Sequence, residues 1–303
     1  DVCSSDLGEY VRLIDFRTAL EKEKGALQAI DDKECGFRYS RNAENFKKIP
    51  GSPIAYWVSE REIKIFHESK VVKDYADCCI GMRTGDNARF LRYWFEVCIK
   101  KVGFTFQSAE SAKKSRLKWF PYNKGGEFRK WYGNNEYLVN WENNGSEIKE
   151  NTKLKYPQLG DNLGWKISNE HYYFRKSITW SFVSSSYFGV RYSDKGFIFD
   201  VGGSSMFPSE EYHLFLTGFL CCKLSTILMK ALNPTLNFQV GNVASLPVIL
   251  PSDSMKNVID SLVAQNISLS RADWDSFETS WDFKVHPLVR YKTSRIGEAF
   301  EEW

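Results

Sequence analysis

The sequence GMRTGDNARFLR, from Gly81 to Arg92, opens the stretch on which the interpretation of this 303-residue chain depends. The block from Gly81 to Lys130 carries twelve Lys/Arg and four Asp/Glu, a formal charge of +8, whereas the whole chain carries +3. Aromatic residues are interleaved with these cations, among them Trp94, Phe95, Trp119, Phe120, Tyr122, Phe128, Trp131 and Tyr132. Concentrated positive charge attracts polyanions, and aromatic and Arg planes stack on bases. Composition alone is equally consistent with a nucleic-acid-binding surface and with a solvated basic face beside an ordinary aromatic core.

Length and composition describe a globular protein with an ample core, since 43% of the 303 residues are hydrophobic and 26% are charged. No apolar run reaches the length of a membrane span and no signal peptide is recognisable, so we expect no membrane partner. Seven cysteines without a CxxC spacing favour reduced thiols and a cytoplasmic location. The first methionine is Met82, which predicts a fragment or a processed product.

Local patterns predict an α+β fold of mixed strands and helices with helical flanking segments. Thr18 and Ser59 are expected N-caps, and Glu21 completes a capping box with Thr18. Gly202-Gly203 is expected to be a plain turn and not a cofactor-binding loop. Periodicity predicts strands at 10–16, 137–141, 172–191 and 196–201, a turn at 143–145, and helices at 18–30, 59–75, 209–232 and beyond 251.

Two longer motifs carry a resemblance to a known family. They are GxxTGDNxxFLR (Gly81 to Arg92) and NPTxNFQxGNxxxLP (Asn233 to Pro247). They resemble the opening and closing signatures of the target-recognition domain in single-chain adenine-specific DNA methyltransferases and type IIG restriction–modification enzymes. KWFPYNKGG (118–126) and WYGNN (131–135) fit the same family. IPGSPIAYWVS (49–59) and WDSFETSWDFKVHPL (274–288) are closer still to the adenine methyltransferases of the BREX phage-defence system, and the resemblance covers nearly all of the chain after its first seven residues.

The resemblance implies three regions: residues 1–76 as a joint to a missing upstream methyltransferase domain, 77–250 as a DNA target-recognition domain, and 251–303 as a truncated helical extension. The one Asn-Pro, Asn233-Pro234, lacks the second proline and the aromatic of the family's catalytic motif, so no catalytic residue is expected here. No cofactor is expected in this fragment, because S-adenosylmethionine would bind the upstream domain. Four histidines without HxH or HxxxH spacing predict no metal site.

The expected partner is double-stranded DNA, bound through the basic block. We predict phosphate anchoring by Lys100, Lys101, Lys113, Lys114 and Lys118. Because Arg is the commonest reader of guanine and Asn/Gln of adenine, we predict base-edge contacts by Arg83, Asn87, Arg89, Arg116, Asn123, Lys124 and Arg129. For each of these residues a surface or capping role is the alternative. The turn from Thr84 to Asn87 is expected to be a conformational device whose side chains bond the turn backbone.

Three other functions remain open at this stage. The same basic face suits a protein-interaction module that docks other BREX components or an acidic phage-encoded DNA mimic. The Trp, Tyr and Asn content also suits a carbohydrate-binding module, although the +8 block argues against it. A recognition domain of a type IIG restriction–modification enzyme is a further alternative, because the two enzyme classes share this domain.

Overall fold

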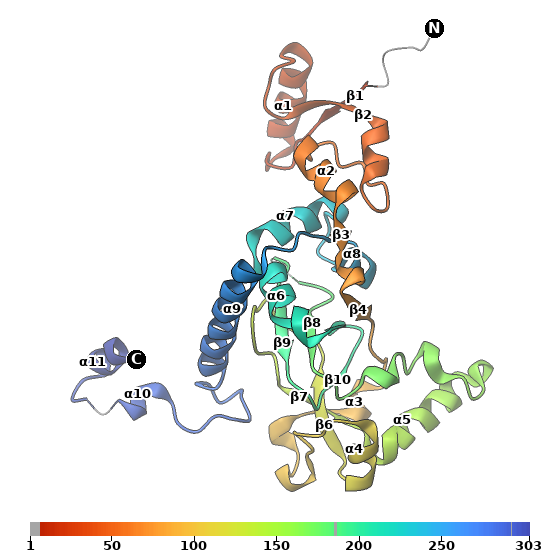
Figure 1. Ribbon diagram of the computed structural model, residues 1–303, viewed down its shortest axis with the longest axis vertical. Coiled ribbons are helices and arrows are strands. Elements are labelled where there is room, and N and C mark those ends of the chain that lie inside the picture. The colour runs from red at the N-terminus through yellow and green to blue at the C-terminus, as the bar shows by residue number, and fades with distance from the viewer. Residues whose placement is uncertain (1–6, 185–186, 292) are drawn as a thin grey trace.

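The computed structural model describes residues 7–184, 187–291 and 293–303 (Figure 1). It confirms the α+β fold class. The described residues form two four-stranded sheets, in the orders β10-β6-β7-β5 and β4-β11-β8-β9, and two two-stranded sheets, β1-β2 and β12-β3.

The described residues form α-helices and short 3-10 turns. The α-helices are α1 (Ala19–Asp31), α2 (Glu60–Glu68), α3 (Asn87–Phe90), α4 (Ala109–Ser115), α5 (Glu142–Lys155), α6 (Glu210–Cys221), α7 (Lys223–Leu232), α8 (Val240–Ala244), α9 (Asp253–Trp274), α10 (Pro287–Arg290) and α11 (Ile296–Glu302). The 3-10 turns are η1 (Ala43–Lys48), η2 (Val72–Asp74), η3 (Trp94–Glu96), η4 (Ile99–Lys101), η5 (Pro157–Leu159), η6 (Leu163–Trp165) and η7 (Glu170–Tyr172).

The strands are short, as is usual where sheets are interrupted by loops. They are β1 (Leu7–Val11), β2 (Arg38–Asn42), β3 (Lys70–Val71), β4 (Ala76–Cys79), β5 (Leu91–Tyr93), β6 (Trp119–Asn123), β7 (Tyr137–Asn140), β8 (Ser177–Trp180), β9 (Val190–Ser193), β10 (Ile198–Phe199), β11 (Ser205–Pro208) and β12 (Pro247–Val248). The predicted strand at 137–141 is β7, that at 196–201 contains β10, and 172–191 contains β8 and the start of β9.

The predicted capping box of Thr18 and the predicted N-cap Ser59 are both present near the N-terminal end of the molecule. Thr18 caps α1 and exchanges hydrogen bonds with Glu21, and Ser59 caps α2 in the same way with Glu62. The helix expected at 59–75 ends already at Glu68, where the chain turns into the edge strand β3. Strand pairing with β12 therefore overrides the helical periodicity after the second turn.

The helical lobe consists of the sheet β4-β11-β8-β9 with α2, α6, α7, α8 and α9. Its core joins residues 49–76 to residues 178–248, so side chains far apart in the sequence share one apolar cluster. The single helix expected at 209–232 is wrong: the chain bends by 76° between α6 and α7, at Cys222. No single helix among the described residues is long and apolar enough to cross a membrane, and only this bent pair has the length and composition when taken together.

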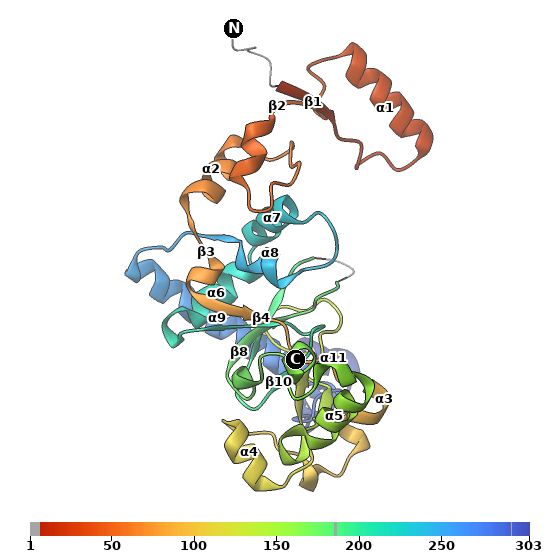
Figure 2. The same cartoon turned by 90° about the vertical axis from the view of Figure 1, so that its right-hand side faces the viewer.

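The basic lobe consists of the sheet β10-β6-β7-β5 with α3, α4 and α5. Figures 1 and 2 place it at the end of the molecule opposite β1 and β2. Phe120, Tyr122 and Trp141 are among the side chains of its core. Asn143, Asn144 and Gly145 have left-handed φ values of 50°, 61° and 71°, as a turn requires, but they lead directly into the rest of α5.

Candidate nucleic-acid interface

Four exposed cations gather around η4 and α4, and we call Lys100, Lys101, Lys113 and Arg116 the basic end. The Lys118 amide donates to the Lys101 carbonyl (3.2 Å), so η4 lies beside the start of β6, which follows α4 in the chain. Among the described residues, none of the four makes an ion pair. Their charge is therefore available to an external anion.

A network of ion pairs borders the basic end. Glu147 of α5 contacts Arg89 (3.7 Å) and Lys118 (3.3 Å), and Glu142 lies 3.8 Å from Lys118. Partial burial raises the pKa of Glu147, but hydrogen bonds with Asn140 and Lys118 and the charges of Lys118 and Arg89 outweigh this effect, so the pKa is lowered. Exposed pairs of this kind contribute only about 0–1 kcal/mol, so a phosphate group competes readily for their cations.

The Thr84 to Asn87 turn has the structural role that its sequence predicts. The Asp86 carboxylate caps α3 by accepting from the Arg89 amide (3.0 Å), and the Thr84 hydroxyl donates to the Asn87 side-chain oxygen (2.5 Å). Lys155 of α5 donates to the Gly85 carbonyl (3.0 Å) and fixes the turn against the lobe. Asn87 and Arg89 remain exposed at the surface of α3.

Two other predicted cations, although exposed, are engaged within the protein. Arg83 is exposed and donates to the Trp165 carbonyl (3.3 Å), and Lys114 pairs with Glu110 one turn earlier (2.6 Å). The sequence predicts that five further residues contact DNA beside the basic end, and the structure places all five on the basic lobe. They are Arg83, Asn87, Arg89, Lys114 and Lys118.

The remaining predicted readers lie in the inner loop, residues 123–133, where each is engaged within the protein. Asn123 is 4% exposed and its amide donates to the Ser193 hydroxyl (2.9 Å), so the predicted base contact is not possible in this conformation. Lys124 pairs with Asp200 (2.8 Å). Arg129 pairs with Asp273 (3.0 Å) and lies over the Trp274 ring at 4.9 Å.

Asp200, which sequence reasoning missed, organises the inner loop. Its carboxylate accepts from the Tyr122 hydroxyl (2.8 Å), the Lys124 ammonium (2.8 Å) and the Gly202 amide (2.6 Å). Burial, reinforced by this carboxylate, raises the pKa of Tyr122 well above its ordinary value. Gly203 approaches so closely that a Cβ there would lie 2.1 Å from the Asn123 carbonyl. The only sequence signal for Asp200 is its place at the end of the buried segment GFIFDV.

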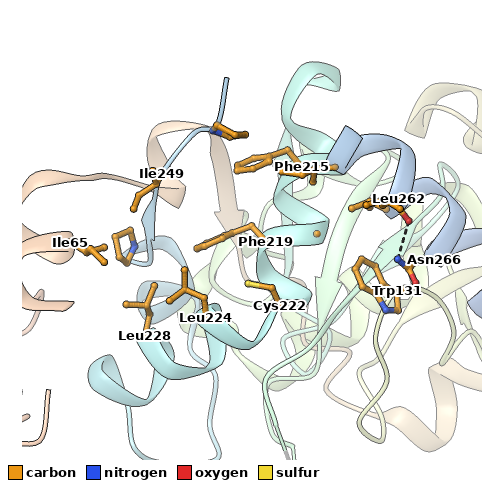
Figure 3. Close-up of a pocket in the computed structure, with 15 residues that line it drawn as sticks. Ile65, Trp131, Phe215, Phe219, Cys222, Leu224, Leu228, Ile249, Leu262 and Asn266 are labelled. Atoms are coloured by element: carbon orange, nitrogen blue, oxygen red, sulfur yellow. Dashed lines mark hydrogen bonds between the residues drawn. The ribbon is translucent and has the colours of Figure 1, made fainter. Parts of the chain in front are cut away.

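An apolar groove of about 370 Å³ lies on the helical lobe, between α6, α7, α9 and the segment 247–251. Figure 3 shows Phe219, Leu224 and Leu228 facing this space, with Ile249 on the other side. None of its fifteen lining residues is charged. The groove therefore does not suit a polyanion, and the basic end is the better candidate for nucleic acid.

Comparison with known proteins agrees with the resemblance seen in the sequence. No protein-family model matches the chain. It is 37% identical, over 98% of its length, to "Adenine-specific methyltransferase PglX" of Lacticaseibacillus casei (strain Zhang). The chain is a relative of the PglX adenine-specific methyltransferases. It is also 38% identical, over 82% of its length, to "Adenine-specific methyltransferase BrxX" of Escherichia coli O9:H4 (strain HS). It spans 24% of the length of the PglX relative and 19% of the BrxX relative.

Proposed function

We propose that this chain recognises duplex DNA for a site-specific, S-adenosylmethionine-dependent adenine-N6 DNA methyltransferase that acts in the cytoplasm in phage defence. One observation carries the proposal: four exposed cations without an internal ion pair gather at one end of a chain related to PglX and BrxX. The relatives are adenine-specific methyltransferases by name, which makes DNA the polyanion to expect. S-adenosylmethionine would bind a part of the enzyme outside these residues.

The four cations would act through the phosphate backbone. Each cation that neutralises a phosphate releases a condensed counterion, so affinity depends steeply on salt. Lys and Arg at the basic end set the position of the lobe on the duplex, whereas Asn87 and Arg89 on α3 are the neighbouring side chains with the chemistry to read base edges. Phosphate anchoring and base reading thus belong to adjacent elements of one lobe.

Duplex binding at several salt concentrations tests the anchoring step. Changing Lys100, Lys101, Lys113 and Arg116 together to Ala is expected to weaken binding about ten- to a hundredfold. It should also reduce the slope of log affinity against log salt by about three to four. The matched control changes Arg17, Lys22, Lys24 and Lys33 to Ala, because these are also exposed, carry the same charge and make no ion pair among the described residues. Equal losses in both variants would contradict a localised DNA surface.

Methylome sequencing tests the enzymatic part of the proposal. A cell that carries the complete methyltransferase gene should show one N6-methyladenine motif, and the four substitutions at the basic end should reduce its occupancy. An unchanged motif in that variant would exclude the basic end as an anchor, and no motif in either strain would refute the methyltransferase assignment.

A further inference from the structure

A second cavity, of about 610 Å³, lies between the basic lobe and the helical lobe, beside α9 and the segment that follows it. It is lined from the basic lobe by Ile99 of η4 and the segment 104–107, and from the other side by the end of β9, Arg271 of α9 and Trp281-Asp282. Its volume is in the usual range for a small-molecule site, roughly 300–1,000 Å³. Because Ile99 directly precedes Lys100 and Lys101, the cavity is close to the basic end.

Aromatic rings form much of the cavity wall. The Trp281 ring centroid lies 5.1 Å from that of Phe104 and 6.0 Å from that of Phe197. On another wall, the Arg271 guanidinium lies over the Tyr132 ring at 4.4 Å. Trp281 is only partly buried, so part of its indole remains available to a planar ligand. Aromatic and guanidinium planes of this kind are the usual stacking partners of nucleobases.

The polar groups of the cavity divide into those already neutralised and those still open. Asp194 accepts a hydrogen bond from Arg271. Burial, reinforced by the Asp194 carboxylate, raises the pKa of Tyr192 to about 12. Lys176 is paired with Glu210. Among the described residues, the buried Arg271 Nε has no hydrogen-bond partner, and exposed Lys195 has no ion pair.

The open groups supply both donors and acceptors. Lys195 can donate to an anionic oxygen, whereas the Asp282 carboxylate, the Gln107 amide and the Thr105 hydroxyl can pair with the polar edge of a base. An apolar ligand would leave these groups unpaired, and an extended polyanion is larger than a cavity of about 610 Å³. Aromatic side chains in the wall, an unpaired lysine and polar side chains together match a planar heterocycle that carries one anionic group.

We propose that this cavity binds a single nucleotide, with its base against Trp281 and Phe104 and its phosphate at Lys195. The proposal does not depend on duplex binding by the basic end. The nucleotide is either a free mononucleotide or an unpaired nucleotide of a DNA strand, since both present the same base and phosphate.

Calorimetric titration of the 303-residue chain with 5′-dAMP tests the free-nucleotide source. Trp281→Leu is expected to weaken binding about tenfold because it removes the stacking surface, and Lys195→Ala to weaken it several-fold. Trp281→Phe should retain most of the affinity, because it keeps an aromatic ring. If Trp281→Leu does not fold, the comparison of the single variants Trp281→Phe and Lys195→Ala still tests the site. Lys33→Ala, an exposed change far from the cavity, is the control.

A duplex with one 2-aminopurine opposite an abasic site tests the DNA source. Binding should change the probe fluorescence in the wild type and less in Trp281→Leu, whereas a fully paired probe should not respond. A response in either titration that depends on Lys195 and Trp281 supports the site and identifies the source. Failure of the chain to bind 5′-dAMP and the unpaired probe, or equal binding by all variants, would overturn it. The four-substitution variant of the basic end should keep its 5′-dAMP affinity. Nucleotide binding in the cavity can therefore be tested separately from duplex binding by the basic end.

Discussion

The basic end and the inner loop both come from the same +8 block, yet their cations have opposite roles. Lys100, Lys101, Lys113 and Arg116 have no ion pair among the described residues. In the inner loop, Lys124 and Arg129 pair with carboxylates and Lys130 donates to the Cys221 carbonyl (2.6 Å). Part of the positive charge that is concentrated in this block therefore stabilises the fold through internal contacts. Only the contacts that each side chain makes in the fold distinguish the cations that remain available to an external anion.

Of the changes that test this difference between the basic end and the inner loop, Asp200→Ala is expected to have the largest effect on stability. The change removes the acceptor of Tyr122, Lys124 and the Gly202 amide inside the protein, so it should lower the free energy of unfolding by about 3 kcal/mol. Urea denaturation measures this. Asp161→Ala is the control, because Asp161 pairs with Lys153 at an almost fully exposed site and its loss should leave the urea midpoint unchanged. Equal midpoints in both variants would show that the inner loop is not held by Asp200.

The structural features that the sequence predicted are those decided by neighbours in the chain. The capping box at Thr18 and the N-cap at Ser59 each involve a residue three positions away, and both are present. The burial of Asn123 depends on Ser193, seventy residues later, and no local pattern contains that information. The bend between α6 and α7 was missed for a related reason: a helix that is apolar nearly all round does not show where tertiary packing divides it.

The same limit applies to the candidate site. The sequence located the cations of α4 and η4 because their number is visible in the composition. It did not reveal that Glu147 would bring Arg89 and Lys118 together, because their three segments meet only in the folded lobe. The basic character of the region was therefore predictable, and the accessibility of each side chain was not.

Asn123 and Asn87 give an intermediate test, because the two residues differ in burial. Asn123→Ala leaves the Ser193 hydroxyl without its donor and should cost about 1–2 kcal/mol of unfolding free energy, with little effect on duplex affinity. Asn87→Ala removes the acceptor of the Thr84 hydroxyl and should cost about 1 kcal/mol of unfolding free energy. Because Asn87 is exposed on α3, the change should also weaken specific duplex binding about fivefold. Unfolding curves and DNA titrations on both variants check this. A larger DNA effect for Asn123 would mean that the inner loop opens on binding.

The smallest expected effect comes from Glu110→Gln, which converts a paired cation into a free one. Lys114 is held by Glu110 at 2.6 Å on an exposed face of α4, and such pairs contribute at most about 0.5 kcal/mol to stability. Releasing Lys114 beside Lys113 should raise duplex affinity about two- to threefold at low salt and steepen the salt dependence. Glu44→Gln frees Lys47 in the same way near the N-terminal end, far from the basic lobe, and should leave affinity unchanged. If the double change Glu110→Gln with Lys114→Gln still binds more tightly than the wild type, the gain would come from losing a negative charge and not from freeing Lys114. The availability of individual cations would then matter less than the net charge of α4.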